Sequence, residues 1–315
     1  MVKYVALFPG QGAQFPQMGL DLYDKYEKVR DLFTLAGDVT HTDFYNLLKT
    51  GEEEELQKTH NTQLLITLIN RCCSVVVKEK NYQPVVAAGF SLGELSAYTE
   101  ASMLDEETLF SLVMHRGTIM ARHGEMVQKE LGQIGMAAVM NLSFDKIDEI
   151  ITQSNIKHIY AANDNSTSQV VVAGLFSSIS QIEPLLKEAG AKRIIPLKVS
   201  GPFHTPLMEG AKIEFEEILK NIEFSDPTFP VYSNVHAKVV QSKDEAKELL
   251  AKQLTSPVRW SSIVTEVEQS YPTHKAIEVG PNKVLTGLFR STNVVCYPSG
   301  SVGDIERIEK EMRDE

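Results

Sequence analysis

The chain has 315 residues, and its 31 Lys and Arg against 42 Asp and Glu give a formal charge of −11 with histidine neutral. This balance argues against a nucleic-acid-binding protein, because such proteins usually carry a basic surface. The composition, 43% hydrophobic and 23% charged, is close to the globular average and excludes disordered and fibrous classes. The length suits one large domain or about two of ordinary size.

Three cysteines, Cys72, Cys73 and Cys296, form neither a disulfide framework nor a CxxC metal clasp, which favours a reducing compartment. The apolar run that ends at Pro9 is too short for a secretory signal peptide. No apolar run approaches the ~18 residues that a membrane-spanning helix needs. We therefore expect a soluble, cytoplasmic protein with no membrane partner.

Strand-like and helix-like segments alternate over most of the chain, which predicts an α/β fold with a parallel sheet. Strands are expected at residues 5–8, 85–90, 231–233 and 276–278, and helices at residues 61–77, 208–219 and 244–254, with another helix after residues 280–282. Asp105 is a plausible N-cap for a further helix, which we expect to end near Gly124. The charged residues 304–315 are expected to form a solvated terminal helix.

Between about residues 135 and 197 the expected elements are shorter and closer together. Strands are expected at residues 136–139, 159–162, 169–173 and 193–197, with helices at residues 144–151 and 179–189. This βαββαβ order is that of the ferredoxin-like unit. We predict a large α/β domain of residues 1–127 and 199–315, into which a ferredoxin-like small domain of residues 128–198 is inserted.

The strongest local motif is Gly89-Phe90-Ser91-Leu92-Gly93, a GxSxG between an expected strand and an expected helix. This is the context of a nucleophile elbow. The sharp turn leaves no room for side chains at the two glycines, and it presents the serine hydroxyl at a helix N-terminus. The alternative is a tight βα turn with an N-capping serine. We favour Ser91 as a nucleophile, and the chain order of Ser91 before His204 agrees with a hydrolase-like large domain.

A serine nucleophile needs a base, and His204 is the best candidate among the eight histidines. It lies in Gly201-Pro202-Phe203-His204-Thr205-Pro206, where glycine and prolines restrict the backbone after an expected strand. The alternative is a turn histidine that caps the next helix. No aspartate occupies an obviously matching loop, so we expect a backbone carbonyl to orient the histidine. Surface positions are expected for His41, His60, His158, His236 and His274.

Arg116 lies on the helix after the elbow and has two interpretations. It is either a snorkelling surface residue or a bidentate partner for a substrate carboxylate, and helical periodicity does not decide between them. Gly10-Gln11-Gly12 lacks the GxxxxGK[ST] pattern of a phosphate loop. It is better interpreted as a turn whose exposed backbone N–H contributes to an oxyanion hole. No HExxH, helically spaced histidine pair or CxxC indicates a metal site.

Together these motifs closely resemble the malonyl-CoA:acyl carrier protein transacylases of bacterial fatty-acid synthesis. The resemblance covers almost the whole chain. It rests on Phe8-Pro9-Gly10-Gln11-Gly12, residues 89–94, Arg116-Gly117, Asn165-Ser166, residues 169–174, Gly201-Pro202-Phe203-His204, Gln253-Leu254, Pro257-Val258, Trp260 and Glu278-Val279-Gly280-Pro281. Such ordered co-occurrence is far more specific than GxSxG alone.

The resemblance implies that Ser91 takes the malonyl group from malonyl-CoA as an ester, with His204 as general base and then general acid. The backbone N–H groups of Gln11 and Leu92 would hold the oxyanion, and Arg116 would bind the malonyl carboxylate. The backbone carbonyl of Gln253 would orient the histidine. Supporting roles would fall to Asn163, Asn165 and Phe203. No cofactor is implied, the acceptor is the phosphopantetheine thiol of holo acyl carrier protein, and the family favours a monomer.

Two positions depart from the family pattern. Phe90 replaces the usual histidine before the nucleophile, and Thr167 replaces the usual proline after Asn165-Ser166. The sequence does not determine how these two residues affect acyl selectivity or how tightly the site closes. An acidic carrier would need a local basic patch on this acidic chain, for which Lys192-Arg193 and Lys198 are candidates.

Three other functions compete with the transacylase. They are an acyl-thioester hydrolase on the same fold, a malonyltransferase that loads polyketide synthase carriers, and a catalytically silent subunit. Arg116 argues against a general hydrolase, because a carboxylate clamp has little use there. The presence of Ser91, His204, Arg116 and Gln11 together argues against a silent subunit. The polyketide alternative is chemically identical to the fatty-acid enzyme and differs only in the partner.

Overall fold

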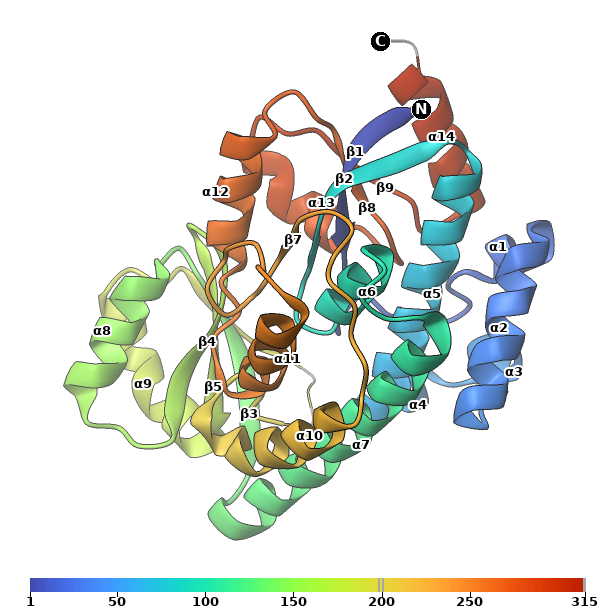
Figure 1. The fold of residues 1–315 in the computed structure, drawn as a ribbon. Helices are drawn as coiled ribbons and strands as arrows, with labels where there is room; N and C mark the ends of the chain where they lie inside the picture. Colours follow the sequence, from blue (N-terminus) through green and yellow to red (C-terminus); the bar gives the residue numbers. More distant parts are fainter. Residues whose placement is uncertain (198, 200, 314–315) are drawn as a thin grey trace.

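A five-stranded sheet forms the centre of the larger part of the molecule (Figure 1). The computed structural model describes residues 1–197, 199 and 201–313. The strands lie in the order β7-β2-β1-β8-β9, and every neighbouring pair is parallel. They are β1 (Val2–Phe8), β2 (Tyr82–Gly89), β7 (Val231–Tyr232), β8 (Ala276–Glu278) and β9 (Cys296–Pro298). The first four confirm predicted strands. β9 was not predicted, because it is short and contains proline, which is uncommon in strands.

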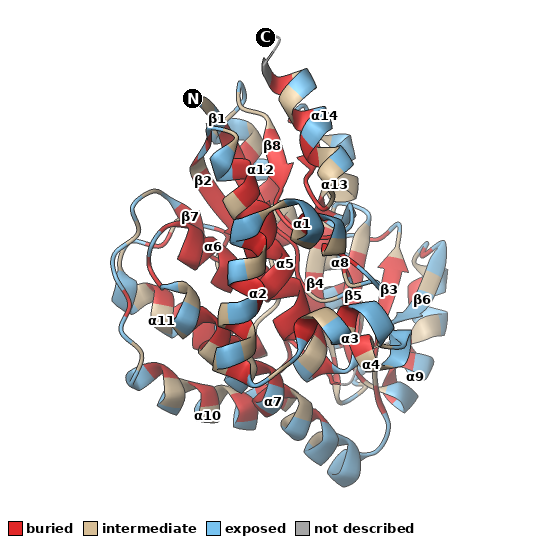
Figure 2. Cartoon of the chain, turned by 90° about the vertical axis from the view of Figure 1, so that its right-hand side faces the viewer, coloured by how far each residue is buried: buried red, intermediate tan, exposed pale blue. Residues whose placement is uncertain are grey.

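The parallel sheet is buried on both faces. Alternate residues of β1 enter two different apolar clusters, with Ala6 and Phe8 on the side of α5 (Thr59–Glu79) and Leu7 on the side of α12 (Trp260–Ser270). Figure 2 shows α5 and α6 (Gly93–Glu100) as almost entirely buried segments inside the molecule. A helix buried all round is typical of a large core.

The remaining helices surround this core (Figure 1). They are α1 (Leu20–Lys25), α2 (Glu27–Thr40), α3 (Phe44–Thr50), α4 (Glu53–Gln57), α7 (Glu106–Leu131), α10 (Glu209–Lys220), α11 (Lys243–Lys252), α13 (Val284–Leu288) and α14 (Val302–Arg313), with short 3-10 helices at Pro206–Met208, Gln253–Thr255 and Phe289–Ser291. The predicted helices in this part of the chain correspond to α5, α6, α7, α10, α11, α13 and α14. The short α1, α3 and α4 were not predicted, because one or two turns show no clear period. α2 and α12 were also missed, although the apolar residues of α2 recur at helical spacing.

Two predicted helices differ from the structure in extent or environment. Asp105 caps α7 by accepting a hydrogen bond from the Thr108 N–H (2.7 Å), as predicted, but the helix passes Gly124 and ends at Leu131. Gly124 is buried within the helix, and the positive φ of Gly132 marks its end. The terminal helix α14 was predicted, but it is solvated on one face only, because Ile305, Ile308 and Met312 are buried against the core.

A four-stranded antiparallel sheet forms the smaller part, in the order β4-β5-β3-β6. Its elements are β3 (Ile134–Met140), α8 (Phe144–Ser154), β4 (Ile159–Ser166), β5 (Gln169–Leu175), α9 (Phe176–Glu188) and β6 (Arg193–Leu197). They confirm the ferredoxin-like βαββαβ unit. Because side chains alternate along a strand, Ala137 and Val139 pack with α8 and α9 while Met136 and Ala138 face a cavity on the other side.

The small sheet is tied to the rest of the chain near α12. The Asp164 N–H donates to the Val258 carbonyl (2.8 Å), and the Val258 N–H donates to the Ala162 carbonyl (3.0 Å). This parallel bridge connects β4 to the segment that immediately precedes α12. The domain boundaries between residues 127 and 128 and between residues 198 and 199 stay a prediction. The first boundary falls within α7, which ends at Leu131. Within the described residues no helix is long and apolar enough to cross a membrane.

Candidate active site

The GxSxG motif forms a sharp turn between β2 and α6. Ser91 has a φ of 50°, a left-handed conformation that is uncommon for a residue with a side chain. A Cβ on Gly89 would lie 1.9 Å from the Gly93 carbonyl carbon, and one on Gly93 would lie 2.1 Å from the Phe8 carbonyl oxygen. The two glycines are therefore required by the close approach of backbone segments, as in a nucleophile elbow.

The structure places Ser91 and His204 in contact. The distance from Ser91 Oγ to His204 Nε2 is 2.8 Å, and that from His204 Nδ1 to the Gln253 carbonyl oxygen is also 2.8 Å. Since a carbonyl can only accept, Nδ1 carries the proton and Nε2 is free to accept from the serine hydroxyl. The histidine is thus oriented by a backbone carbonyl in place of a carboxylate.

The environment of His204 keeps the imidazole neutral. The residue is 4% exposed, and burial lowers its pKa to about 4, with the charge of Arg116 acting in the same direction. A neutral imidazole is the form that accepts a proton. Of the five histidines that were predicted at the surface, His41 and His60 are exposed. The remaining three, His158, His236 and His274, are partly buried.

A pH profile tests this environment. We expect the rate constant for inactivation of Ser91 by a neutral fluorophosphonate to stay constant from neutral pH down to about pH 5 and to fall by half near pH 4. The direction follows because the base works when deprotonated, and a lowered pKa preserves that form in more acidic solution. A neutral probe avoids titration of a substrate carboxylate. A midpoint near 6.5, the ordinary histidine value, would contradict the buried imidazole.

Two backbone N–H groups lie at the mouth of the elbow. Gln11 and Leu92 both line the cavity around Ser91, and neither N–H donates to another described residue. Leu92 precedes the first residue of α6, where helix N–H groups have no intrahelical acceptor. Such free N–H groups can donate hydrogen bonds to a carbonyl oxygen on which negative charge develops.

Arg116 is buried, at 1% exposure, and lines the same cavity. Its Nη atoms donate to two neutral oxygens, Gln63 Oε1 and Gln253 Oε1, at 2.8 Å each. Its Nε has no hydrogen-bond partner, and within the described chain no carboxylate forms an ion pair with it. Burial lowers its pKa to about 10, so the guanidinium stays charged near neutral pH. The surface interpretation of this residue is therefore excluded.

The cavity has a volume of about 480 Å³ and lies between the two sheets. Asn163, Asn165 and Phe203 contribute to its wall and are all nearly buried. The Oδ1 atom of Asn165 has no partner among the described residues. Apolar side chains of both parts, Met136 and Leu288 among them, make up much of the remaining surface. The cavity thus joins a serine hydroxyl, a neutral imidazole and a guanidinium that forms no ion pair with a described carboxylate, in a mostly apolar enclosure.

The two departures from the family pattern have different environments. Phe90 lines the cavity and packs edge-to-face on Trp260, with ring centroids 5.4 Å apart. An apolar ring therefore lies beside Ser91. Thr167 is exposed and does not line the cavity.

Three buried polar residues of the site were not predicted. The side chain of Asn234 accepts a hydrogen bond from the Ser91 N–H in the elbow. Glu94 accepts from the Asn234 N–H (2.8 Å) and from Gln253 Nε2 (2.9 Å). Gln63 accepts a hydrogen bond from Arg116. Glu94 immediately follows the motif, so a charged residue at a buried helix start was an available signal. Asn234 and Gln63 lie far away in the sequence and carry no local pattern.

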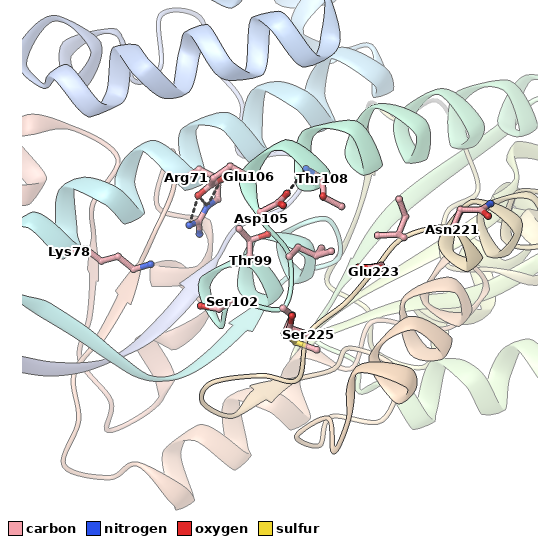
Figure 3. A pocket seen from close by; sticks show the side chains of 13 residues that line it. Arg71, Lys78, Thr99, Ser102, Asp105, Glu106, Thr108, Asn221, Glu223 and Ser225 are labelled. Carbon is pink, nitrogen blue, oxygen red and sulfur yellow. Dashed lines mark hydrogen bonds and ion pairs between the residues drawn. The ribbon is translucent and has the colours of Figure 1, made fainter.

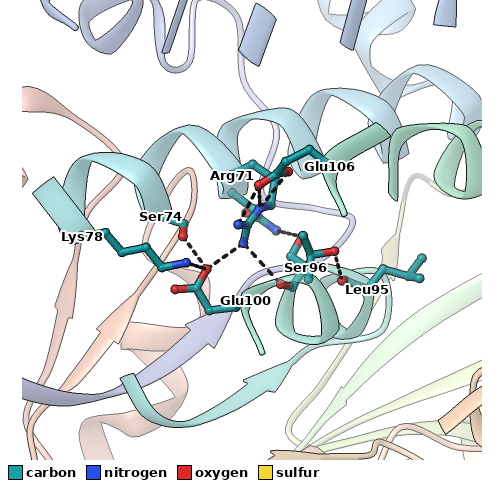
Figure 4. Close-up of polar contacts among 9 residues, drawn as sticks. Arg71, Ser74, Lys78, Leu95, Ser96, Glu100 and Glu106 are labelled. Carbon is teal, nitrogen blue, oxygen red and sulfur yellow. Dashed lines mark hydrogen bonds and ion pairs between the residues drawn. The ribbon is translucent and has the colours of Figure 1, made fainter. Parts of the chain in front are cut away.

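A second cavity, of about 790 Å³, lies beside α5 and the start of α7 (Figure 3). Its arginine, Arg71, is already bonded to Glu100 (2.8 Å) and Glu106 (2.8 Å), as Figure 4 shows. The described residues that line it include no histidine or cysteine. It therefore lacks a nucleophile–base pair and a free cation of the kind found beside Ser91. Elsewhere in the described chain, no group of three or more His, Cys, Asp or Glu side chains is placed to hold a metal ion.

Comparison with known proteins gives the family. Residues 5–299 match the family model of the acyl transferase domain. The chain is 37% identical over 295 residues to the malonyl CoA-acyl carrier protein transacylase of Staphylococcus aureus, with 93% of each chain covered. The transacylase of Bacillus subtilis is 36% identical over 297 residues, covering 93% of this chain and 91% of that protein. The chain belongs to the malonyl-CoA:acyl carrier protein transacylases, a family of acyltransferase enzymes.

Solved structures of this family share the fold. The crystal structure of the transacylase from Streptococcus pneumoniae has a TM-score of 0.90 at 36% identity, covering 98% of this chain and 99% of that one. A malonyl-transacylase in complex with a type II PKS acyl carrier protein also has a TM-score of 0.90, at 32% identity and with the same coverage. The family resemblance and the fold class predicted from the sequence are confirmed.

Proposed function

We propose that this protein transfers the malonyl group of malonyl-CoA to the phosphopantetheine thiol of holo acyl carrier protein, supplying fatty-acid chain elongation. The observation that carries the proposal is Arg116, a buried cation without a carboxylate partner among the described residues, which faces the cavity of the Ser91–His204 pair. A bidentate guanidinium suits a free carboxylate, and an acyl donor that carries one would complete its hydrogen bonds. The activity of the family supports the same donor and acceptor.

In the first half-reaction Ser91 Oγ attacks the thioester carbonyl carbon while His204 Nε2 takes the hydroxyl proton. The carbonyl oxygen becomes an oxyanion that accepts hydrogen bonds from the N–H groups of Gln11 and Leu92. The C–S bond then breaks, the malonyl ester remains on Ser91, and the CoA thiolate takes the proton from His204. Nδ1–H remains bonded to the Gln253 carbonyl, which holds the imidazole in one tautomer.

The second half-reaction reverses these steps with another thiol. The carrier thiol gives its proton to His204 and attacks the malonyl ester, and the Ser91 oxygen leaves and regains that proton. The acyl donor and the acceptor thiol react with the same serine in turn, so ping-pong kinetics follow. Water must be excluded between the two visits. The mostly apolar wall of the cavity, which includes Phe90 and Phe203, supports transfer over hydrolysis.

The remaining parts of the proposal concern partners. No cofactor is needed beyond the malonyl-CoA thioester and the carrier thiol, and we propose a cytoplasmic monomer. Lys192 and Arg193 are exposed at the edge of the small sheet and are proposed to face an acidic carrier, whereas Lys198 lies outside the described residues. The chemistry would be unchanged with a polyketide synthase carrier, so only carrier preference separates that function.

The test is the intact mass of the purified protein after brief exposure to malonyl-CoA or acetyl-CoA, followed by addition of holo acyl carrier protein. We expect a malonyl adduct that is absent from Ser91→Ala and that moves to the carrier when it is added. An adduct released as free malonate in place of transfer would identify a hydrolase. A protein that takes up neither acyl group would contradict the proposed function.

A further inference from the structure

Asn234 lies under the elbow and has no exposed surface. Its side-chain Oδ1 accepts from the Ser91 N–H, and its Nδ2 donates to the Gly89 carbonyl, both at 2.6 Å. Its own backbone N–H donates to Glu94 Oε2 (2.8 Å), and its carbonyl accepts from the Arg259 N–H (3.0 Å). The backbone of this residue is therefore anchored, and its carboxamide is directed at the two residues that flank Phe90.

The side chain of Asn234 continues the hydrogen-bond pattern between β2 and β7 beyond the end of these strands. β2 pairs with β7 in the register Ala87 to Val231 and Ala88 to Tyr232, so two further residues would bring Phe90 opposite Asn234. In a parallel ladder a residue bonds through its N–H and C=O to the two neighbours of the residue opposite. The Asn234 carboxamide makes those two bonds, because it has the same donor and acceptor as a peptide group.

The bond to Ser91 has two consequences for the nucleophile. It holds the peptide of a residue with a φ of 50°, a conformation that persists only where surrounding contacts define it. It also occupies the Ser91 N–H, while the next N–H along the chain, that of Leu92, donates to no other described residue. A Gln253 side chain holds the same residue from its other end, because Nε2 donates to the Ser91 carbonyl (3.1 Å).

We propose that Asn234 is the positioning residue of the nucleophile elbow. Its carboxamide holds the Ser91 peptide so that Oγ stays within hydrogen-bond distance of His204 Nε2, and it directs the Ser91 N–H away from the oxyanion. The identity of the acyl donor in this inference rests on the proposed function, whereas the reactivity of Ser91 does not. Asn234 touches no substrate, and its effect is on alignment alone.

Two variants test the alignment. Asn234→Ala removes both bonds, and Asn234→Asp keeps an acceptor for the Ser91 N–H but cannot donate to the Gly89 carbonyl when ionised. In a stopped-flow burst with malonyl-CoA, we expect the acylation rate constant to fall about 100-fold for alanine and about 10-fold for aspartate. The burst amplitude, which counts competent sites, should stay near one per chain. Asn293→Ala, an exposed asparagine that bonds Glu268, is the control and should match the wild type.

The amplitude separates positioning from a merely structural role. A smaller burst whose rate constant equals that of the wild type would mean that Asn234 only helps the protein to fold, and it would overturn the proposal. Rate constants within threefold of wild type would do the same. If Asn234→Ala does not fold, the isosteric aspartate variant is judged by the same two criteria.

A neutral fluorophosphonate keeps this test independent of the substrate. Its labelling rate at Ser91 should fall by similar factors in the two variants, because it reports the same alignment of Oγ and Nε2. If wild-type protein were labelled but took no malonyl group, the proposed function would fail while the comparison of variants still decided the role of Asn234. Unchanged labelling in both variants would overturn the positioning role.

Discussion

Arg116→Ala is expected to lower kcat/KM for malonyl transfer by about 10³-fold, because a desolvated carboxylate that loses its charge partner costs about 2–5 kcal/mol. Acetyl transfer should stay within about threefold of the wild type or rise. Acetyl has no carboxylate, so in the native enzyme it leaves a guanidinium that is 1% exposed without a full set of partners. Removing the guanidinium removes that penalty. The ratio of kcat/KM for malonyl-CoA to that for acetyl-CoA should therefore fall towards one or below it. Steady-state rates with both CoA thioesters measure this ratio.

Two variants accompany this measurement. Arg116→Lys retains a charge but not the planar fork, so we expect an intermediate loss of malonyl transfer. Arg122→Ala lies on the same helix, where the side chain is half exposed and pairs with Glu214, and it should leave both activities unchanged. An equal loss of malonyl and acetyl transfer in Arg116→Ala would assign Arg116 to the fold and not to the carboxylate.

Ser91→Ala and His204→Ala should each reduce malonyl transfer by at least about 10⁴-fold, because the nucleophile and its base act as one unit. The Oγ–Nε2 contact of 2.8 Å leaves no intervening water, so loss of the base removes direct proton transfer. Ser91→Ala should also lose the mass adduct altogether. His204→Ala should still form it, but over hours in place of seconds. Rapid-quench sampling of the acyl-enzyme measures both.

The double variant sharpens this prediction. If the two side chains work as a pair, Ser91→Ala combined with His204→Ala should be no slower than the worse single variant, within about threefold. Multiplied losses would mean that the two residues contribute independently. A His204→Ala variant that kept a tenth of the wild-type acylation rate would show that another group takes the serine proton.

Local constraints explain why much of the site was predictable. A GxSxG turn requires glycine on both sides of the serine, because a Cβ at either position would lie only about 2 Å from backbone atoms of other residues. The motif is recognisable because these requirements fall within five consecutive residues. The Gly201–His204 segment likewise restricts its own backbone. The strands β1 and β2 were evident because both faces of a parallel sheet are buried, which produces continuous apolar runs.

Burial and long-range contacts account for what was not predictable. Periodicity left Arg116 undecided between surface and clamp, because its burial depends on α5 packing beside α7, far away in the sequence. The burial of α14 escaped the sequence analysis for a similar reason. Its charges dominate the composition, while three apolar residues on one face meet a core assembled from other segments.

The sequence alone predicted Ser91 as the nucleophile, and it indicated the family and the alternation of strands and helices, because these depend on neighbouring residues and on motifs that occur in order. Tertiary structure decided the distances between the site residues and the protonation state of His204. Ser91 and His204 are 113 residues apart, and only the fold brings them to 2.8 Å and removes enough water to lower the pKa of the imidazole to about 4. The same holds for Asn234, which lies 143 residues from Ser91 and bonds it only because β7 lies beside β2. Hydrogen bonds and desolvation act over a few ångströms in space, and sequence separation carries no information about them.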